Sequence, residues 1–408
     1  MKAAIIGAGS EALHTIQKAK EYGLTILALD GNPKAEGLMV ADKAIVVDIS
    51  DEKATIDTVR AEKADFVLTV PIGRYLTTIG AVNDALELPG ISREMARICT
   101  DKYAFHDKLQ KAGLRECKCY DVETITNAQK KSVFDDIGIE KFEISYPAIL
   151  KPRYGSGSRG IHMIDQECKL QEAVNAVEGE PYVLEECVAG EEYGVDGVVI
   201  DGRFQMVLLR HKENTPPPAR QAVAYFSVQP DDAFAVNVKE HMERVVSCLG
   251  ISECLLHADI IRGEEGPFVI ELSARPSGHN LHNLFTPLCT GIDMAEEYIK
   301  YRMNIPYSFN PKGTKGMMIH YFDIQGKVIS VPDKEAVEEL LTKQMKDPGE
   351  PVCKLSHWNC TIKEGEELKP VSDGHSLMGR GYFVLEGEGE AILRAKAEEI
   401  KKLFCTQK

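Results

Sequence analysis

The stretch His257-Ala-Asp-Ile-Ile-Arg-Gly-Glu-Glu-Gly-Pro-Phe-Val-Ile-Glu-Leu-Ser-Ala-Arg-Pro276 decides the fold, because it has the pattern of a β-hairpin. Polar and apolar residues alternate along both arms, so one face of the hairpin is polar and the other is apolar. A register that packs the apolar residues together also places Asp259 opposite Glu271 on the polar face. The apolar face is then expected to contain Ala258, Ile260, Phe268, Ile270 and Leu272.

This arrangement of acids predicts a metal site. Asp259 and Glu271 would face each other across the hairpin, with the hydroxyl of Ser273 beside them. Such a set suits Mg²⁺, which keeps several waters and takes its other oxygens from substrate phosphates. We therefore predict that these three residues bind Mg²⁺, with Mn²⁺ as an alternative metal. The competing interpretation is two solvated acids on an exposed hairpin face.

A second motif combines a lysine with a loop rich in glycine and serine. A short apolar strand ends at Lys151, and Gly155-Ser-Gly-Ser-Arg-Gly160 leads into another apolar strand. Glycine lets backbone N–H groups approach a phosphate closely, and lysine adds a point charge. No Gly-Lys-Ser/Thr follows, which excludes a Walker loop. The predicted phosphate-binding residues are Lys151, Gly155, Ser156, Gly157, Ser158 and Gly160, and a plain surface hairpin is the alternative.

The order of three motifs resembles that of the ATP-grasp superfamily. The motifs are Lys151 with its loop, the run from Tyr182 to Gly197, and the hairpin from Asp259 to Arg275. Members of the superfamily include D-alanine ligases, biotin carboxylase, purine-pathway enzymes and L-amino acid ligases. The fold that the resemblance implies is α/β and α+β multidomain. It consists of a Rossmann-like parallel α/β domain at 1–95, an ATP-grasp region at 96–310 and a small C-terminal α+β domain at 311–408.

The resemblance also implies roles for single residues. Lys102 and Lys151 are similar to the two nucleotide lysines of the family, and Arg275 to the arginine near the transferred phosphate. Ser273 departs from the family, in which many members have asparagine. A hinge strand is expected to bind adenine, mostly through backbone groups, and an acid after it to hold the ribose. These hinge and ribose residues are Glu185, Glu186, Val188 and Glu192. On charge pattern alone, Glu185, Glu186, Glu191 and Glu192 would be a solvated surface run.

Strand and helix patterns support this division of the chain. Strands are expected at 3–6, 25–29, 44–47 and 66–70, and helices at 92–100, 101–112, 335–345 and 390–404. Residues 213–220 are rich in proline and predict an extended loop near the site. The segments 317–322 and 328–331 flank a polar turn and predict a hairpin. Residues 379–385 resemble the closing strand of L-amino acid ligases, which would bring Arg380 to the substrate or give it a structural role.

The amino terminus suggests a rival function. Gly7-Ala-Gly-Ser-Glu-Ala12 follows one strand and Asp30 ends the next, which matches the dinucleotide fingerprint in its alanine-ended form. An NAD-dependent dehydrogenase is therefore an alternative. Glu11 argues against it, because a carboxylate in the first helical turn would repel a bound pyrophosphate. The first domain of ATP-grasp enzymes commonly keeps a similar glycine turn without NAD.

Two further alternatives are weaker. A catalytically dead nucleotide-binding module would not need both lysines, both carboxylates and Arg275. A zinc site at His257, His279 and His282 has no local cysteine or acid to complete a tetrahedral set. These histidines are expected to cap or line the substrate pocket instead, and His279 is the candidate substrate residue together with Arg380.

Composition excludes some classes of partner. The 408 residues carry 48 basic and 63 acidic side chains, a net charge of −15, which argues against binding nucleic acid or an anionic membrane. No apolar run approaches the roughly 20 residues of a membrane span. The eleven cysteines are scattered without a CxxC unit or a signal peptide, which predicts reduced thiols and a cytoplasmic location.

These patterns lead to one functional prediction. The chain is expected to be an ATP- and Mg²⁺-dependent ligase that activates a small carboxylate as an acyl phosphate and joins it to an amine. By the resemblance, ADP and phosphate are released, and the substrates are small molecules. A biotin carboxylase-like enzyme that activates bicarbonate is the nearest alternative. Neither the acid, the amine nor the oligomeric state can be read from the residues, and a homodimer is one possibility.

Overall fold

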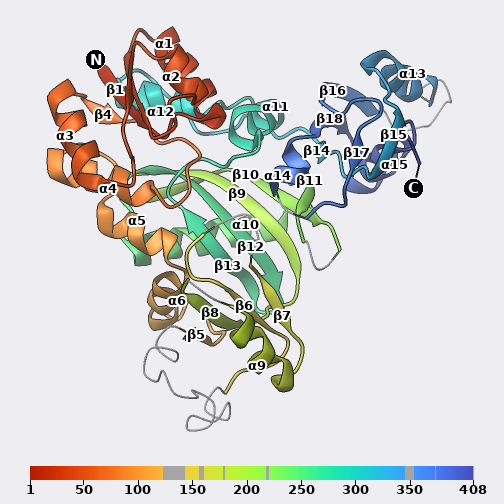
Figure 1. The fold of residues 1–408 in the computed structure, drawn as a ribbon, viewed down its shortest axis with the longest axis horizontal. Coiled ribbons are helices and arrows are strands. Elements are labelled where there is room, and N and C mark those ends of the chain that lie inside the picture. Colours follow the sequence, from red (N-terminus) through yellow and green to blue (C-terminus); the bar gives the residue numbers. More distant parts are fainter. Residues whose placement is uncertain are drawn as a thin grey trace.

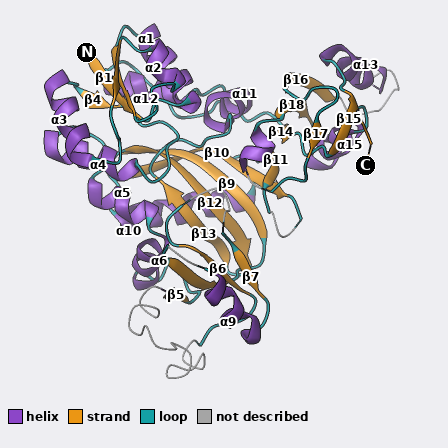
Figure 2. Cartoon of the chain, in the orientation of Figure 1, coloured by secondary structure: helices purple, strands orange, loops and turns teal. Residues whose placement is uncertain are grey.

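The computed structural model describes residues 1–122, 143–155, 160–177, 180–216, 220–344, 353–372 and 374–407. Figure 1 shows an N-terminal unit, a large curved central sheet with a smaller sheet below it, and a C-terminal unit on the other side of the central sheet. Figure 2 shows that the N-terminal unit is wrapped by helices, whereas strands dominate the centre. The described helices include none long and apolar enough to cross a membrane. All eleven cysteines are free.

The N-terminal unit is a parallel α/β layer, as predicted. Its four strands lie in the order β3-β2-β1-β4 and pair in parallel. Asp51 caps the third helix by accepting the N–H of Ala54 at 3.0 Å, and that helix ends at Lys63 in the left-handed region. The elements are β1 (Lys2–Ile6), α1 (Leu13–Glu21), β2 (Thr25–Asp30), α2 (Glu36–Val40), β3 (Lys43–Val46), α3 (Glu52–Glu62), β4 (Phe66–Val67) and α4 (Leu76–Leu86), with a 3₁₀ turn η1 (Ser10–Ala12) before α1.

Two capped helices lead from this unit toward the rest of the chain. Ser92 caps α5 (Arg93–Thr100) and Asp101 caps α6 (Lys102–Lys111), each through its side-chain oxygen. Both helices were predicted at these positions. The cap at Asp101 makes Lys102 the first residue of α6, where its side chain points away from the helix body toward the glycine loop.

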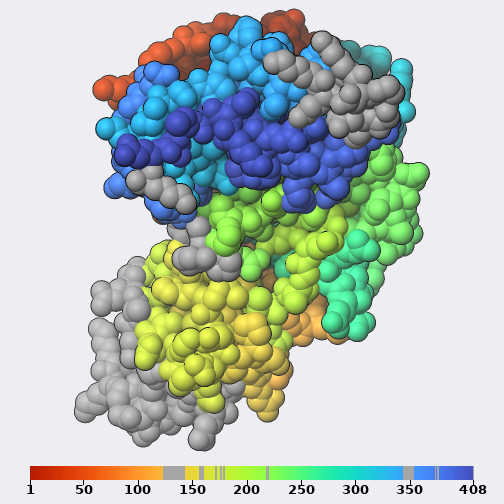
Figure 3. Space-filling model, turned by 90° about the vertical axis from the view of Figure 1, so that its right-hand side faces the viewer, coloured from red at the N-terminus to blue at the C-terminus, as the bar shows by residue number. Residues whose placement is uncertain are grey.

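The smaller sheet forms a separate lobe. Its strands β5 (Cys119–Asp121), β8 (Tyr182–Glu186), β6 (Ala148–Pro152) and β7 (His162–Ile164) lie in that order and pair antiparallel, and α9 (Glu167–Ala176) packs against β7. In Figure 3 the residues of this lobe, in yellow and yellow-green, project below the body that carries the C-terminal residues in blue. Lys151 lies near the end of β6, as predicted, and Glu185 lies on the neighbouring β8.

The central sheet has eight strands. α10 (Ala233–Leu249) covers one face with a buried stripe that includes Phe234, Val238, Met242, Val245 and Leu249, whose spacing of three or four residues follows the helical turn. The opposite face carries the polar residues described below. The strands, in sheet order, are β13 (Gly266–Ser273), β12 (Cys254–Gly263), β9 (Glu191–Ile200), β10 (Arg203–Asn214), β11 (Ala222–Ser227), β14 (Met317–Tyr321), β18 (Gly381–Gly387) and β16 (Cys353–Cys360).

The deciding hairpin forms with the predicted pairing but a different apolar face. Asp259 pairs with Glu271 in β12 and β13, and a bulge directly beyond them leaves Ile270 unpaired. The extra residue moves Val269 onto the buried face, where it is 2% exposed. The prediction that Phe268 and Ile270 belong to the apolar face was therefore wrong, since both are only half-buried. Period-two alternation cannot reveal a bulge.

The C-terminal part differs from the predicted hairpin. β14 joins the central sheet between β11 and β18, whereas β15 (Gly326–Ser330) pairs with β17 (Glu367–Leu368) and β19 (Cys405–Gln407) in a separate sheet. The segment at 381–387 is a strand, as predicted, and it lies inside the central sheet. The remaining helical elements are η3 (Leu281–Phe285), α11 (Thr286–Thr290), α12 (Met294–Arg302), α13 (Lys334–Gln344), α14 (Gly374–Met378) and α15 (Glu390–Lys401).

The predicted proline loop is shorter than expected. Glu213 and Asn214 belong to β10, and Glu213 pairs with Ala224 across to β11. The backbone N–H of Thr215 donates to Gln221 at 2.8 Å, which closes the connection. Residues 217–219 lie outside the described part of the chain. Glu213 and Asn214 were expected in the loop because they are polar, but the end of a strand can also carry polar and charged side chains.

Candidate active site

A pair of carboxylates lies on the polar face of the central sheet. Asp259 of β12 and Glu271 of β13 are direct cross-strand neighbours, and His257 with Ser273 lies two positions further along the ladder. Successive side chains of a strand alternate between faces, so all four share one face. The structure thus brings together the three predicted metal ligands Asp259, Glu271 and Ser273.

Lys212 stands beside these acids and was missed by the sequence analysis. Its Nζ lies 3.2 Å from Oε2 of Glu192 and 3.6 Å from Oδ1 of Asp259. Burial opposes the charged form, but the charges of Asp259 and Glu192 raise the pKa of Lys212 above its ordinary value. Burial likewise opposes ionisation of Asp259, yet Lys212 lowers its pKa. The available signal was the charged pair Arg210 and Lys212 at alternate positions directly after the apolar run 206–209.

A buried ion pair lies beside these residues in the central sheet. Arg210 and Asp196 are both fully buried and bind each other through both guanidinium nitrogens, and Thr286 donates its hydroxyl to Asp196 at 2.7 Å. Gly194 faces this pair, and a Cβ there would lie 3.2 Å from the guanidinium. Removing one partner of such a pair is strongly destabilising, because the other charge is left buried and unpaired.

Lys102 and the start of the glycine loop lie across a cavity from the carboxylates. Nζ of Lys102 donates to the carbonyl oxygen of Gly155 at 2.8 Å. The cavity is lined by Lys102, Gly155, Glu271, Ser273 and Arg275, among others. Burial lowers the pKa of Lys102, an effect that the charge of Glu271 opposes. Five predicted residues from three separate motifs therefore meet at one cavity.

Only the two ends of the predicted glycine loop lie among the described residues. Ser156, Gly157 and Ser158 lie outside the described residues. Gly160 follows them with a φ of +68°, and a Cβ there would meet Pro152 and Tyr182 at 3.0 Å. The chain is thus closely packed where the loop returns to β7.

Two arginines contribute positive charge to the same cavity. Arg275 donates to the carbonyl oxygen of Pro276 at 2.8 Å, and burial lowers its pKa while Glu271 and Glu11 oppose that shift. Arg74 comes from the connection between β4 and α4, at the carboxyl end of the parallel sheet, and it lines the cavity with an exposed side chain. The sequence analysis did not single out Arg74, since one arginine in a loop has no distinguishing pattern.

The predicted hinge strand carries a buried ionic cluster. The side chain of Glu185 pairs with Lys151 and, at 3.1 Å, with Arg115, which also stacks over Phe268. Burial opposes ionisation of Glu185, but the two cations lower its pKa. These pairs orient Lys151 within β6.

The other predicted hinge residues lie around this cluster. Glu186 accepts the backbone N–H groups of Lys118 at 2.8 Å and Ser145 at 3.0 Å. Val188 is half-buried just after β8. Glu192 pairs with Arg220 as well as with Lys212. The side chain of Glu186 therefore ties together the edges of the lobe, and its backbone N–H also donates to the carbonyl oxygen of Lys118 at 3.1 Å.

Arg380 does not reach the cavity. It is 6% exposed, and its two terminal nitrogens donate to the carbonyl oxygens of Ile324 at 2.7 Å and Lys369 at 2.6 Å. Those contacts join loops of the C-terminal unit. Of the two roles that the sequence left open for Arg380, the structure favours the structural one.

The histidines do not form a metal cluster. His279 is exposed, and its backbone N–H donates to Glu11 at 2.9 Å. His282 is fully buried and bonds through Nδ1 to the carbonyl oxygen of Ser277, and His257 bonds to that of Val195 at 3.1 Å. The one metal-compatible group found among the described residues contains none of these three. The zinc alternative at these positions is therefore not supported.

The glycine turn of the first domain is occupied by protein groups. Asp30 accepts the backbone N–H of Ala8 at 2.7 Å and that of Asn32 at 2.8 Å. A Cβ added at Gly7 would lie 2.5 Å from the side chain of Ile72. The acid that a dinucleotide site would offer to a ribose thus already bonds to the backbone of the turn, which weakens the dehydrogenase alternative.

The region that contains Lys151, the hinge strand and the carboxylate pair matches a known family. Residues 144–282 match the family model described as an ATP-grasp domain. The chain carries an ATP-grasp domain. Its sheet topology agrees with this, because the antiparallel lobe and the central sheet approach each other at the cavity between Gly155 and Glu271.

Solved and curated relatives extend this likeness beyond the ATP-grasp domain. The crystal structure of an L-amino acid ligase from Bacillus licheniformis covers 100% of this chain and 99% of its own, with a TM-score of 0.77 and 20% identity. Dapdiamide A synthase of Enterobacter agglomerans is 24% identical over 295 residues, which is 67% of each chain. The arginine-specific large chain of carbamoyl phosphate synthase of Bacillus subtilis is 24% identical over 57% of this chain but only 22% of its own length. At these identities the structural likeness shows the fold alone.

Proposed function

We propose that the chain is an ATP- and Mg²⁺-dependent ligase that joins a small carboxylate to an amine and releases ADP and phosphate. One observation carries the proposal. Glu271, the cross-strand neighbour of Asp259, lies at a cavity that it shares with Lys102, Gly155 and Arg275. A carboxylate pair beside converging cations is the arrangement that phosphoryl transfer needs, because catalysis there is mostly positioning and charge stabilisation.

The donor set fits Mg²⁺. Asp259 and Glu271 would hold the ion, and the hydroxyl of Ser273 on the same face would be a third, weaker oxygen donor. Lys212 keeps Asp259 ionised, as a metal ligand must be. When bound, Mg²⁺ or Mn²⁺ neutralises phosphate charge.

The proposed chemistry has two displacement steps. The substrate carboxylate attacks the γ-phosphorus of ATP, the bond to the bridging oxygen breaks, and ADP leaves. The amine then attacks the acyl carbon and phosphate leaves with the bonding electron pair. Lys102, Lys151, Lys212 and Arg275 would bind the phosphates, and no protein nucleophile is required. This reaction class agrees with the name of the Bacillus licheniformis ligase, which shares the fold.

The remaining nucleotide contacts follow the fold. Backbone groups of Glu185, Glu186 and Val188 would bind adenine, since the side chains of the first two already have partners. Glu192 would hold the ribose hydroxyls at the start of β9. Oε2 of Glu192 binds Lys212 and Oε1 binds Arg220, so the ribose hydroxyls would bind the remaining lone pairs of these oxygens.

The experiment that tests the proposal is ADP release measured across a matrix of acids and acceptors. The acids are amino acids, other small carboxylates and bicarbonate, and each is tested with and without a panel of amines at saturating ATP and Mg²⁺. We expect release that requires both an acid and an amine, with the joined product identified by mass. Release that requires bicarbonate would favour the carboxylating alternative, and reduction of NAD by a hydroxy acid without ATP would overturn the ligase.

A further inference from the structure

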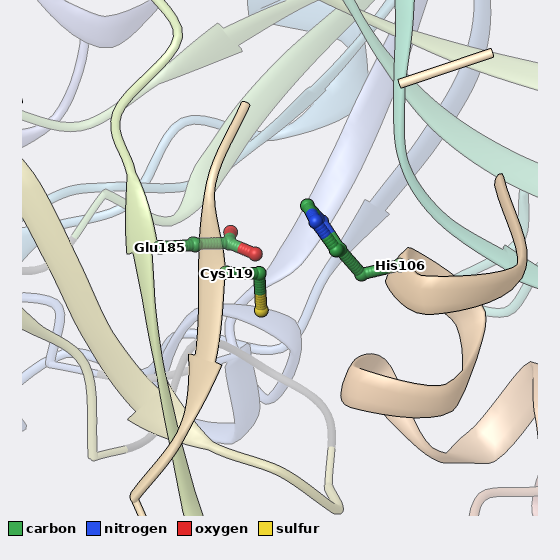
Figure 4. A group of neighbouring side chains, drawn as sticks. All are labelled: His106, Cys119 and Glu185. Atoms are coloured by element: carbon green, nitrogen blue, oxygen red, sulfur yellow. The ribbon is translucent and has the colours of Figure 1, made fainter. Parts of the chain in front are cut away.

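A second group of metal-ligating side chains lies between α6 and the smaller sheet. His106 comes from α6, Cys119 from β5 and Glu185 from β8, as Figure 4 shows. One nitrogen, sulfur or oxygen atom from each lies within 4.8 Å of the others. A helix and two strands, of which β8 is far from the other two in sequence, therefore bring these side chains together.

The imidazole of His106 has unused binding capacity. His106 is 1% exposed, and its Nε2 has no hydrogen-bond partner among the described residues. The other ring nitrogen, Nδ1, lies 4.0 Å from the sulfur of Cys117. A buried polar atom without a partner costs about 1–3 kcal/mol, so a ligand that binds this nitrogen would remove a cost that the protein otherwise bears.

We propose that His106, Cys119 and Glu185 bind a thiophilic divalent cation such as Zn²⁺. Cys117, whose sulfur lies 4.0 Å from Nδ1 of His106, stands outside this group and would have to move to become the fourth ligand. Imidazole nitrogen, thiolate sulfur and carboxylate oxygen are the donors that Zn²⁺ takes in proteins, and sulfur disfavours Mg²⁺. The site differs in chemistry from the oxygen-only set at Asp259 and Glu271. The inference does not depend on the proposed ligase activity.

The distances require a modest closure of the group. Bonds of roughly 2.0–2.3 Å in a tetrahedron hold the ligand atoms roughly 3.3–3.8 Å apart. The present upper limit of 4.8 Å means that the atoms of a pair must approach by about 1.5 Å at most. Cysteine and histidine side chains can make such a movement by rotation about χ1.

Lys151 and Arg115 are the main objection, because both are cations that pair with Glu185. A carboxylate has about four lone-pair sites, so two cationic partners leave capacity for a metal bond. Zinc binds the deprotonated thiol. If Cys117 and Cys119 each lose a proton, the two positive charges of the metal are offset and the net charge of the cluster is unchanged.

The test uses the full-length protein freed of metal with a chelator and then supplied with Zn²⁺ or Co²⁺ alone. We expect about one tightly held Zn²⁺ per chain by elemental analysis. Co²⁺ should give a thiolate charge-transfer band together with visible bands of tetrahedral intensity. Cys119→Ser should abolish the band and weaken metal binding by at least about tenfold. The matched control Cys168→Ser, at an exposed cysteine on α9, should behave like the wild type.

Alkylation of the wild-type protein gives a second measurement that does not depend on a variant folding. Zn²⁺ should slow modification of Cys117 and Cys119, mapped by mass spectrometry, and leave Cys168 unaffected. Absence of the cobalt–thiolate band, equal metal binding by Cys119→Ser, or zinc protection confined to other cysteines would each overturn the proposal. None of these readouts needs turnover, so failure here leaves the ligase proposal to its own test.

Discussion

Two glycine turns look alike in this sequence and differ in what their surroundings offer a ligand. At the N-terminal turn, Asp30 accepts the N–H of Ala8, and the side chain of Ile72 lies over Gly7. At the second turn, Lys102 holds the carbonyl oxygen of Gly155 beside a cavity. In the first turn, polar groups bond to other groups of the same domain. The second turn lies beside charged residues from other parts of the chain.

The comparison teaches that a glycine pattern predicts a turn and not a ligand. The second turn becomes a candidate site because β13 supplies Glu271, the segment just after β13 supplies Arg275, and α6 begins at Lys102. None of those residues is near the turn in sequence. Near the first turn, Glu11 instead accepts the backbone N–H of His279.

The largest expected difference between the two turns is in turnover. Glu271→Ala should reduce ADP release by about 10²-fold or more, because it removes the carboxylate that we propose binds the metal at the transferring phosphate. Asp30→Ala removes the acceptor of two backbone N–H groups and should cost about 1–2 kcal/mol of stability while most turnover remains. Initial rates at saturating ATP and Mg²⁺, with melting curves for both variants, check this. Equal loss in the two variants would remove the distinction.

Ligand binding to the unmodified protein is the next test of the comparison. ATP or ADP with Mg²⁺ at about 100 times its dissociation constant should stabilise the native state by about 2.7 kcal/mol, and NAD or NADP should give no stabilisation. Thermal melting with each ligand measures the difference. Omitting Mg²⁺ should reduce the shift with ATP. A shift with NAD alone would show that the N-terminal turn binds a dinucleotide after all.

Local patterns predicted the neighbours of single residues better than they predicted the pairing of the sheets. Asp259 was expected opposite Glu271 from the alternation of polar residues, although the bulge that completes this pairing was not predicted, and the caps at Ser92 and Asp101 follow from side-chain chemistry. The pairing of β14 with β11 could not be predicted, because 317–322 and 328–331 look like one hairpin and local spacing does not reveal a distant partner. The place of β14 in the sheet depends on contacts with strands that are far away in sequence.

Lys212 and Arg74, which the sequence analysis did not single out, share one property. Lys212 became part of the candidate site only when β10 was placed beside β9 and β9 beside β12, which sets its Nζ between two acids. Arg74 joined it because a loop of the first domain reaches the cavity. A side chain whose role depends on elements far away in the chain carries no local signal. Motifs such as the glycine loop carry one because their own backbone forms the feature.

A smaller effect is expected from the lysine of the second turn. Lys151→Ala should weaken ATP binding by about tenfold or more, since a charge-assisted hydrogen bond contributes about 1.5–3 kcal/mol. The matched control Lys169→Ala removes an exposed lysine of the same lobe, which pairs with Asp165, and should leave the affinity unchanged. Calorimetric titration with ATP and Mg²⁺ measures both. Unchanged affinity in Lys151→Ala would mean that this lysine serves only to neutralise Glu185.

The smallest effect should come from the first turn itself, through stability and not through binding. Gly7 has a φ of +89°, and an alanine there would also press on Ile72, so Gly7→Ala should cost about 1–2 kcal/mol. Gly9 has a φ of −69° and no atom within 4 Å of an added Cβ, so Gly9→Ala should stay within about 0.5 kcal/mol of the wild type. Urea unfolding compares the two variants, and ATP affinity should be the same in both. If Gly7→Ala instead weakened ATP binding without loss of stability, the first turn would be a nucleotide site, and the contrast with the turn at Gly155 would have to be abandoned.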